Sequence, residues 1–575
     1  MTHKPALPIT LPAWRSRLLA ALLLLGLIGL MGRAAYLQGM RNDFLQQKGE
    51  SRYGRVLEMS AYRGVITDRH GEPLAISTPV ESVWVSPQDV EATPEQLKKL
   101  ASLIEMDAAE VRKRVGERQR EFVYLKRHLS PEIATKVVEL NIPGVFLQRE
   151  YRRYYPAGEV MAHVLGFTDV DDNGQEGIEL AQQEVLAGKP GSRRVIKDRK
   201  GHIVEDVESI RAPRPGQDLA LSIDSKIQYL AYRELKQAVE ANKAKAGGIV
   251  VLDAQTGEVL ALANLPVYNP NNRVKVNGGR ARNRALTDEF EPGSTLKPFT
   301  IAAALDAGLV KPDTVFQTAP GTLTIGTATI HDAHQEGALT VAQVIQKSSN
   351  VGAAKIALSM PSQIMWEMLS HSGFGTTTGS GFPGEVNGKL RPYRSWRPIE
   401  QATMSYGHGI AVSLLQLARS YTLFAAGGEL KPVSLLKLDA PVVGKQIVTR
   451  DTALAVSKML EMVVQPGGTA PRAQITGYRV AGKTGTAHKL AAAGGYAENR
   501  YVASFVGYAP ASNPRLIIAV MLDEPSAGQY YGGAVAAPVF SQVMAGALRI
   551  LSVPHDAPAN NVVLFPAAPE SKGDV

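Results

Sequence analysis

The sequence predicts an α+β protein in which a large mixed domain follows a polar N-terminal domain and one membrane-spanning helix. Three observations support this prediction. Strand-like runs lie near residues 248–263 and 481–523, and a mainly helical region at 294–423 separates them. The stretch 38–215 is polar and rich in Arg and Glu, and the first 37 residues contain a long apolar run. A sheet whose two ends are distant in sequence, with a helical insertion between them, is typical of α+β or mixed α/β domains.

Length and composition indicate an ordinary globular chain of more than one domain. The chain has 575 residues, and single cores stop growing at about 250–300 residues. It is 45% hydrophobic and 20% charged, with a net charge of +9. The basic residues are scattered and no nucleic-acid motif is present, so we expect no nucleic-acid partner. The absence of cysteine excludes disulfides, thiolate metal sites and lipid attachment through cysteine.

The N-terminal apolar run predicts a membrane anchor at 18–37. Leu18 to Gly32 carries no charge, and counted to Leu37 the run reaches the ~20 residues that span a bilayer. The apolar run is preceded by three basic residues, Lys4, Arg15 and Arg17. They predict that the N-terminus at 1–17 stays in the cytoplasm and that the rest of the chain is exported. A cleaved signal peptide is the alternative. Because Arg33 interrupts the place of a small-residue cleavage site, we favour the uncleaved anchor.

The polar stretch 38–215 predicts a separate domain without catalytic chemistry. Arg63 to Ala75 alternates and turns at His70-Gly71, while Glu95 to Ala108 and Ser130 to Leu140 have the period of amphipathic helices. No nucleophile–base pair stands out, so a structural or partner-binding role is expected. The Pro- and Gly-containing segment 212–216 is a predicted hinge, which places the next domain at 216–555 and a flexible tail at 556–575.

The domain at 216–555 has recognisable strands at both ends. Lys226 to Asn242 is a predicted helix. Five segments are predicted strands, the first two forming a hairpin: Gly248–Asp253, Glu258–Ala263, Ala481–Ala487, Tyr501–Ala509 and Leu516–Asp523.

The helical region opens on a candidate nucleophile. Pro292-Gly293 turns the chain, and Ser294 stands where a helix N-cap is expected. Lys297 follows at i+3, on the same helical face, so its amine can reach the Ser294 hydroxyl. Serine needs a base beside it, and lysine serves only if burial or a second cation lowers its pKa. The spacing alone is weak, since Ser434 and Lys437 repeat it.

Two further motifs in the same domain strengthen the interpretation. Ser348-Ser349-Asn350 lies between two helical patterns. Lys483-Thr484-Gly485 lies on a predicted strand, is followed by Thr486, and is the chain's only K-[ST]-G. Alone, each motif is usually a cap or a strand end. Together and in this order, S-x-x-K, S-x-N and K-[ST]-G form a known catalytic set, given for β-lactamases and penicillin-binding proteins with S-D-N in the middle.

On these motifs the chain resembles the class B penicillin-binding proteins. The likeness extends over nearly all of 60–550, and the N-terminal domain contains further motifs similar to the family's pedestal domain: Arg63-Gly64-Val65-Ile66-Thr67-Asp68-Arg69, Tyr155-Pro156-Ala157-Gly158 with His163 and Gly166, and Gly177-Ile178-Glu179. Ser405-Tyr406-Gly407-His408-Gly409 with Gln416 resembles the division-specific FtsI type. Ser349 stands where β-lactamases often have Asp, which this family tolerates.

The resemblance implies the fold and the activity. The fold would be a transpeptidase domain, with an antiparallel sheet and a helical subdomain, on an elongated pedestal with one transmembrane helix. The activity would be cross-linking of peptidoglycan stem peptides at the septum, with β-lactams as covalent inhibitors. The resemblance also implies an inner-membrane protein with a periplasmic catalytic domain, and as partners an FtsW-like glycan polymerase of the SEDS type and other division proteins.

The resemblance also implies a role for each motif residue. Ser294 attacks the D-Ala-D-Ala carbonyl, Lys297 takes its proton, and Ser348 relays that proton to the leaving amine. Asn350 holds a substrate amide and the Lys297 amine. Lys483, Thr484, Gly485 and Thr486 form the substrate-binding strand that meets the terminal carboxylate. The backbone N–H groups of Ser294 and Thr486 form the oxyanion hole.

Other candidates around the cleft remain open from sequence. Tyr501, Tyr530, Tyr531 and His488 are possible cleft-wall residues, although core or surface aromatics are the alternative. His331 and His334 flank Asp332, but the mechanism needs no metal or other cofactor, and none is expected.

Two other functions share these motifs. A D,D-carboxypeptidase or β-lactamase would let water reach the acyl-enzyme, and the sequence does not show whether water or an amine does so. A non-catalytic division scaffold would keep the fold without the chemistry. The anchor and the large non-catalytic domain favour the transpeptidase.

Overall fold

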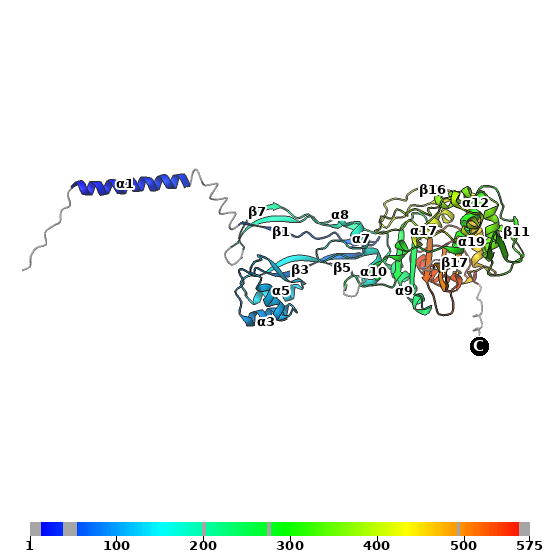
Figure 1. Ribbon diagram of the computed structural model, residues 1–575, viewed down its shortest axis with the longest axis horizontal. Helices are drawn as coiled ribbons and strands as arrows, with labels where there is room; N and C mark the ends of the chain where they lie inside the picture. Colours follow the sequence, from blue (N-terminus) through cyan, green and yellow to red (C-terminus); the bar gives the residue numbers. More distant parts are fainter. Residues whose placement is uncertain (1–12, 38–53, 198–202, 273–277, 491–494, 563–575) are drawn as a thin grey trace, which may run out of the picture. The chain divides into compact units, whose positions relative to one another are not determined.

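The computed structural model describes residues 13–37, 54–197, 203–272, 278–490 and 495–562 (Figure 1). Its contacts divide the chain into two compact units. Unit 1 contains Met1–Tyr62, Pro79–Tyr151 and Gly188–Pro215, and unit 2 contains Arg63–Thr78, Arg152–Ala187 and Gly216–Val575. Two segments of the predicted pedestal, 63–78 and 152–187, therefore pack with the larger unit, so a single boundary near residue 215 does not describe the packing.

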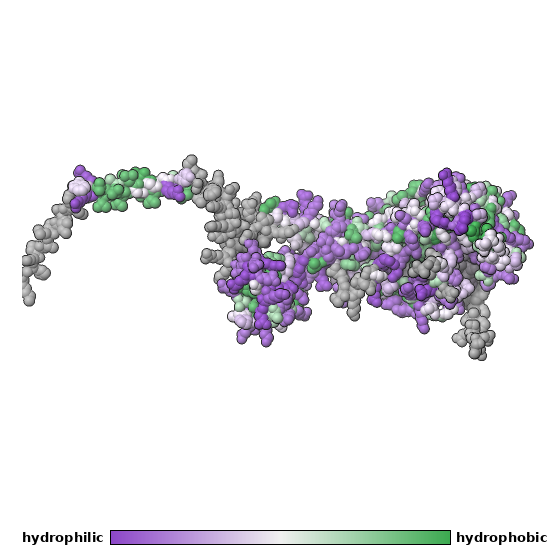
Figure 2. Space-filling view, in the orientation of Figure 1, coloured by the Kyte–Doolittle hydropathy of each residue, from purple (hydrophilic) through white to green (hydrophobic). Residues whose placement is uncertain are grey.

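The apolar N-terminal run forms helix α1, Ala13–Ala35, which is 23 residues long and is the green rod in Figure 2. It is long and apolar enough to cross a membrane. It begins five residues before the predicted span at 18–37, and it contains Arg15 and Arg17 in its first turns. A second stretch, Gly532–Ile550, passes the same test, but 56% of its window is buried inside unit 2. We therefore assign that stretch to the core.

Unit 1 has its own small core. Strands β3 (Pro73–Val85, whose second half belongs here) and β4 (Val123–Leu129) pair antiparallel, and helices pack on them: α3 (Pro94–Leu103), α4 (Ala108–Val115) and α5 (Pro131–Glu139). Thr93 and Asp107 cap α3 and α4, so the predicted helix Glu95–Ala108 ends early, at Leu103, and a second helix begins at Ala108. A separate antiparallel sheet has the order β1-β6-β7: Gly54–Met59, Gly191–Lys197 and Ile203–Arg211.

The pedestal-like sequence motifs meet inside unit 2. The Arg63 Nε lies 2.5 Å from one Glu179 carboxylate oxygen, and the Arg153 Nε lies 2.6 Å from the other. All three side chains are at most 1% exposed. Arg153 lies on β5 (Val145–Tyr154) and Glu179 on the short helix α7 (Gly177–Ala181). Removing one partner from a buried ion cluster strongly destabilises the fold, because it leaves an uncompensated buried charge. This cluster therefore holds together segments that are distant in sequence.

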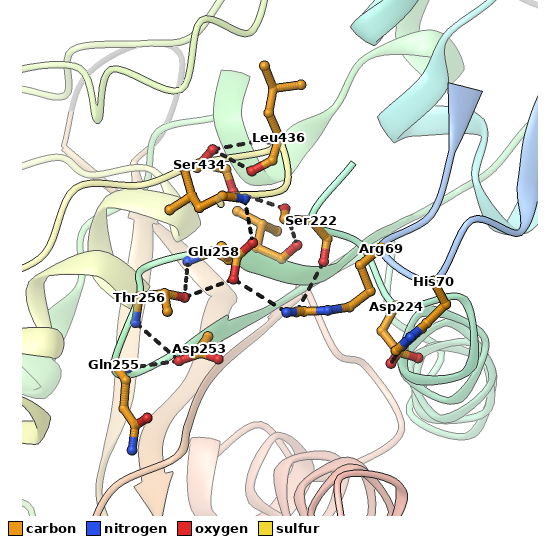
Figure 3. A network of polar contacts seen from close by, with 12 residues as sticks. Arg69, His70, Ser222, Asp224, Asp253, Gln255, Thr256, Glu258, Ser434 and Leu436 are labelled. Atoms are coloured by element: carbon orange, nitrogen blue, oxygen red, sulfur yellow. Dashed lines mark hydrogen bonds and ion pairs between the residues drawn. The ribbon is translucent and has the colours of Figure 1, made fainter. Parts of the chain in front are cut away.

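A second polar network joins the segment 63–78 to the part of unit 2 that begins at Gly216 (Figure 3). The Arg69 guanidinium donates to the Glu258 carboxylate and to the Ser222 carbonyl, both at 3.4 Å. His70 Nε2 lies 3.0 Å from the Asp224 carboxylate, which also caps helix α9, Ser225–Ala241. Beside this network, β2 (Ile66–Thr67) pairs in parallel with β8 (Leu219–Ala220).

The main sheet of unit 2 is antiparallel and has the order β10-β9-β19-β18-β17. Its strands are β9 (Ala246–Asp253), β10 (Val259–Leu265), β17 (Ala481–Leu490), β18 (Tyr496–Ala509) and β19 (Leu516–Asp523). Strand β19 pairs with β9 along its whole length, so the two ends of the catalytic sequence form one sheet, as predicted. Helices α9 and α21 (Ala537–Ile550) pack together and cover one face, and β17 lies at the sheet's edge.

The predicted helical region forms a subdomain against this sheet. Its main helices are α12 (Lys297–Asp306), α13 (Val341–Lys347), α14 (Asn350–Leu358), α15 (Ser362–His371), α16 (Pro398–Met404), α17 (Leu414–Ser420) and α18 (Thr422–Ala425). Helix α19, Arg450–Val464, packs on α12, α13 and β17. The prediction of a mainly helical stretch missed two small two-stranded sheets, β11 (Val315–Gln317) with β14 (Ala338–Thr340) and the hairpin β12 (Thr322–Ile325) with β13 (Ala328–His331).

The first part of the predicted flexible tail is fixed. Asp556 accepts hydrogen bonds from the Arg479 N–H and from Ser512, and the Asn561 side chain bonds the backbone of Ile475, Gly477 and Tyr478. The prediction is therefore wrong for 556–562, because two polar side chains bind backbone groups that a composition-based reading does not see. Residues 563–575 lie outside the described residues.

Candidate active site

The candidate nucleophile lies in a tight turn at the start of α12. Gly293–Leu296 form a 3-10 turn, and α12 begins at Lys297. Ser294 is thus the second residue of that turn and not a helix N-cap, because the 3-10 turn continues directly into the helix. Gly293 has a φ of +58°, a left-handed conformation that favours glycine. The turn is anchored by the Thr295 hydroxyl, which donates to the Pro292 carbonyl at 2.8 Å.

The Lys297 amine occupies the centre of the site. Its Nζ lies 2.9 Å from Ser294 Oγ, 3.1 Å from Ser348 Oγ and 2.8 Å from Asn350 Oδ1, and it also contacts the Ser348 carbonyl oxygen. The two carbonyl-type oxygens can only accept, so they take two N–H groups. The remaining position faces hydroxyls, where the lone pair of a neutral amine can accept the Ser294 proton. The i, i+3 spacing thus brings base and nucleophile into contact.

The middle motif joins two helices at a strained residue. Ser348 ends α13 with a φ of +61°, a region that residues other than glycine seldom adopt. This conformation presents both its carbonyl and its hydroxyl to Lys297. Ser349 caps α14 by accepting the Gly352 N–H at 2.9 Å. Strain of this kind clusters at functional sites.

Asp332 supports the middle motif, and sequence reasoning missed this role. Its carboxylate accepts the Ser349 hydroxyl at 2.7 Å, the Val351 N–H at 3.0 Å and the Asn350 N–H. A carboxylate at a helix N-terminus is favourable, and here it fixes the first turn of α14, which carries Asn350. The sequence drew attention to Asp332 only because histidines flank it, and its true partners lie 17–19 residues away.

Strand β17 supplies the third motif. The Lys483 Nζ donates to Ser348 Oγ at 2.9 Å, so Ser348 stands between the two lysines. Gly485 allows β17 to approach the nucleophile turn: a Cβ there would lie 2.3 Å from Ser504 Oγ, 2.8 Å from the Pro292 carbonyl and 3.0 Å from a Thr295 methyl group. The glycine in K-T-G is therefore required by contact between the strand and the turn.

The electrostatics favour a neutral Lys297. Complete burial, together with the nearby Lys483 charge, holds the pKa of Lys297 well below its usual value, and Asp332 opposes this shift. Burial also lowers the pKa of Lys483 to about 7. Protonating both buried amines is unfavourable, because each charge is desolvated and the two charges repel each other. One of the two amines is therefore available as a base near neutral pH.

The backbone of Thr486 lies close to the turn that carries Ser294. Thr486 N lies 3.5 Å from the position that a Gly293 Cβ would take, so the Thr486 N–H lies beside the nucleophile turn. The Thr486 hydroxyl accepts the Gly532 N–H at 3.1 Å. Because β17 is an edge strand, its outer backbone groups are open to a ligand.

The predicted wall residues gather into one aromatic group. The Tyr501 and Tyr530 rings stack at 4.1 Å, Tyr530 and Tyr531 at 4.5 Å, and His488 lies 4.6 Å from Tyr501. Gly532, next to Tyr531, bonds Thr486, so the group continues from the edge of β17.

The loop 405–409 reaches the same region through Glu291, a residue that sequence reasoning also missed. The buried Glu291 carboxylate accepts the Gly409 N–H at 2.8 Å and the Tyr496 hydroxyl at 3.1 Å. Burial raises the pKa of Glu291. Burial, with the charges of Lys297 and His488, lowers the pKa of His408 to about 4, which keeps this histidine neutral beside the lysine. The position of Glu291 three residues before Ser294 was the only sequence signal for it.

Two family models match the chain. The penicillin-binding protein transpeptidase domain matches residues 247–545, and the penicillin-binding protein dimerisation domain matches 58–221. The peptidoglycan D,D-transpeptidase FtsI of Escherichia coli K12 is 43% identical over 95% of this chain and 93% of its own. The probable peptidoglycan D,D-transpeptidase PenA of Neisseria meningitidis serogroup A is 44% identical over 92% and 91%.

Solved structures agree with this assignment. The transpeptidase domain of Burkholderia pseudomallei penicillin-binding protein 3 is 50% identical, with a TM-score of 0.55, over 59% of this chain and 98% of that one. A peptidoglycan synthetase from Bifidobacterium adolescentis is 25% identical, with a TM-score of 0.71, over 88% of this chain and 99% of that one.

The chain belongs to the penicillin-binding proteins, as its fold, the three motifs around Lys297 and these relatives show. Along the sequence, the dimerisation domain comes first and the transpeptidase domain follows it. Within that class it is a peptidoglycan D,D-transpeptidase of the FtsI type. Peptidoglycan and β-lactams are the ligands that such a domain binds.

Proposed function

We propose that this chain cross-links peptidoglycan stem peptides at the division septum through an acyl-enzyme on Ser294. The observation that carries the proposal is the position of the Lys297 amine, buried and 2.9 Å from the Ser294 hydroxyl. The amine takes the hydroxyl proton while Ser294 Oγ bonds to the carbonyl carbon of the penultimate D-Ala. The negative oxygen then forms between the Ser294 and Thr486 N–H groups, where one such donor contributes ~3 kcal/mol to transition-state binding.

The leaving D-Ala needs a proton, and Ser348 is placed to deliver it. Its Oγ lies 3.1 Å from the Lys297 amine and 2.9 Å from that of Lys483. The proton taken from Ser294 can pass from Lys297 through Ser348 to the leaving nitrogen as the peptide bond breaks. An acceptor amine then attacks the acyl-enzyme, loses its proton by the reverse route, and frees Ser294.

Substrate binding uses the edge strand and the groups beside it. Lys483 and the hydroxyls of Thr484 and Thr486 suit the terminal carboxylate of the donor peptide. The Asn350 side chain donates to the His331 carbonyl at 2.9 Å and accepts from Lys297, which fixes its orientation for a substrate amide. The aromatic group of Tyr501, Tyr530, Tyr531 and His488 forms the wall beside Thr486.

Labelling with a fluorescent penicillin tests the site assignment. The full chain is acylated, digested and mapped, and a single adduct on Ser294 is expected, with none in Ser294→Ala. An adduct on another side chain contradicts the proposal. Slow loss of the label supports a transpeptidase, because fast turnover would mean that water reaches the acyl-enzyme as in a β-lactamase.

We further propose that α1 is an uncleaved inner-membrane anchor with a cytoplasmic N-terminus and a periplasmic catalytic domain. Arg15 and Arg17 at the start of α1 support this orientation. Protease added to spheroplasts should digest the catalytic domain, while a tag at residue 1 stays protected. Release of the chain by high salt without detergent would contradict an anchor.

Unit 1 is proposed to bind an FtsW-like glycan polymerase and other division proteins. The insertion 79–151 can be removed cleanly, because Thr78 Oγ1 donates to the Arg152 carbonyl at 3.1 Å, so a short turn can join the two ends. The shortened chain should keep penicillin acylation but fail to support division. Normal septation with it would show that this surface has no essential partner.

A further inference from the structure

A basic and aromatic surface lies outside the proposed cleft. Between residues 391 and 397 the chain carries three arginines, a tyrosine and a tryptophan, folded around a 3-10 turn at Tyr393–Ser395. Arg394 is exposed, and its guanidinium lies 5.8 Å from the Tyr393 ring centroid. Arg394 has no carboxylate partner among the described residues. The mechanism uses none of these side chains.

The aromatic side chains of this surface have different roles. Trp396 packs against the core, and its indole N–H donates to the Arg391 carbonyl at 3.0 Å, so it holds the loop in place. Tyr393 is different: its ring lies 5.8 Å from that of Trp366 on α15, and both residues are partly exposed and outside the core cluster, although the Trp366 indole nitrogen is itself buried. An aromatic pair with an arginine against it offers flat apolar faces beside a planar cation.

The charge of the surface is only partly balanced. Arg391 and Arg397 share one carboxylate, Glu400, at 3.0 and 3.3 Å. With Lys389 and Arg394, four cations stand against one anion in this segment. Arg397 has a side chain that is 76% exposed. Its charge is therefore available to an external carboxylate.

Backbone hydrogen bonds and helix α16 connect this segment to the nucleophile turn. Lys389 and Ala411 exchange two backbone hydrogen bonds, and the next residue, Val412, exchanges two with Phe290, four residues before Ser294. Helix α16 runs from Pro398 to Met404 into the loop 405–409. A Cβ on Gly407 would lie 2.2 Å from the Gly293 carbonyl, so that loop lies directly against the turn. A helix of seven residues is about 10 Å long, within the reach of one polymeric substrate.

We propose that Trp366, Tyr393, Arg391, Arg394 and Arg397, called here the Arg394 surface, bind the glycan–peptide polymer outside the cleft. This inference rests on the proposed function, since it names a second contact for the same substrate. The sugar rings have apolar faces that pack on aromatic rings, and the stem peptides have carboxylates that match guanidinium groups. Binding energy from parts of a substrate remote from the reacting bond can raise the rate at that bond.

The test separates small from polymeric ligands on the full chain in detergent. Arg394→Glu is compared with Arg450→Glu, an exposed arginine at the start of α19. The neighbour of that control residue, Thr449, bonds Asp306 at the end of α12 farthest from Lys297. Three readouts are used: the rate of penicillin acylation, co-sedimentation with isolated peptidoglycan after the cleft is blocked with penicillin, and cross-linking of uncross-linked glycan strands that bear pentapeptides.

Arg394→Glu is expected to weaken co-sedimentation about fivefold to tenfold, because it removes one contact between a guanidinium group and a carboxylate of the polymer. Cross-linking should fall in proportion. The acylation rate of Arg394→Glu should stay within about twofold of the wild-type rate, because penicillin binds only in the cleft. Trp366→Leu should weaken co-sedimentation also, and Arg450→Glu should change nothing.

Unchanged co-sedimentation and cross-linking in Arg394→Glu would overturn the inference, and so would a matching loss of acylation, which would mean a structural role. A separate assay with anionic phospholipid vesicles tests lipid as the ligand: weakened vesicle binding with unchanged binding to peptidoglycan would assign the surface to lipid and also overturn the inference. If the wild-type chain acylates but never cross-links, the proposed function fails instead, and the binding data still decide the Arg394 surface.

Discussion

At the scale of single residues, the chemistry depends on two buried lysines that share one serine. Lys297 and Lys483 both contact Ser348 Oγ, and burial lowers the pKa of each. The two amines are needed in opposite states. Lys297 must be neutral to accept a proton, whereas Lys483 must be charged to hold a carboxylate. This division of roles gives the site a defined pH response.

The rate of acylation at low penicillin concentration should follow a bell-shaped pH profile. The acid limb reflects protonation of Lys297, whose pKa burial and the nearby Lys483 charge hold well below its usual value. The alkaline limb should fall near pH 7, where Lys483, with a pKa of about 7, loses its charge. Lys483→Arg keeps its charge at all these pH values, so its alkaline limb should disappear even if its maximum is lower. If the alkaline limb is unchanged in Lys483→Arg, a group other than Lys483 causes that limb.

Asp332 positions the middle motif without touching the substrate. Asp332→Asn loses a charged acceptor for the N–H groups that begin α14 and leaves Asn350 less fixed. We expect penicillin acylation to fall about tenfold to a hundredfold, with a loss of about 1–3 kcal/mol in unfolding free energy. Asp313→Asn is the matched control, since Asp313 is exposed nearby in sequence. If both variants acylate alike, Asp332 has no positioning role.

At the scale of elements, the site exists because β17 lies against the nucleophile turn. Local sequence patterns predicted the strands and helices correctly: the hairpin β9–β10, the helix α9 and the strands β17, β18 and β19 are present. The 3-10 turn at Ser294 could not be predicted, because its shape depends on contact with Gly485 and Gly407 from distant segments. The support from Asp332 was equally hidden, since its partners lie 17–19 residues further on, after strand β14 and helix α13.

Gly485→Ala tests the contact between strand and turn. The added methyl group would meet the Pro292 carbonyl and the Ser504 hydroxyl, so β17 must move away from Ser294. We expect acylation to fall at least about tenfold, because displacements of 1 Å at a reacting centre cost up to 10²-fold. Gly337→Ala is the control, since nothing lies within 4 Å of the position its Cβ would take. Acylation at the wild-type rate in Gly485→Ala would show that the strand tolerates the shift.

At the scale of the whole molecule, the sequence predicted one boundary where the structure has interleaved segments. The arginine, tyrosine and glutamate motifs before residue 215 were assigned to a pedestal from resemblance alone. Arg63, Arg153 and Glu179 lie within the region that the dimerisation-domain model matches, and they form a buried cluster in the same compact unit as the transpeptidase domain. Residues 63 and 179 are too far apart in the chain for any local pattern to connect them.

Glu179→Gln should therefore destabilise unit 2 without changing its chemistry. It removes the single carboxylate between two buried guanidinium groups, a change that costs about 3–5 kcal/mol in comparable ion clusters. Calorimetry should show a clear decrease in melting temperature, while acylation at 25 °C stays within about twofold. Glu184→Gln, at an exposed position on the neighbouring helix α8 (Gln183–Leu186), should change neither. A wild-type melting temperature for Glu179→Gln would contradict a structural role for the cluster.

The position of β17 at the margin of its sheet has a consequence for inhibition. A short extended peptide could lie alongside residues 483–487 as a sixth strand, held by main-chain bonds and by the Lys483 cation at one end. Such a peptide, without a terminal D-Ala-D-Ala bond, would compete with penicillin through non-covalent contacts alone, and mutation of Ser294 would leave its affinity unchanged.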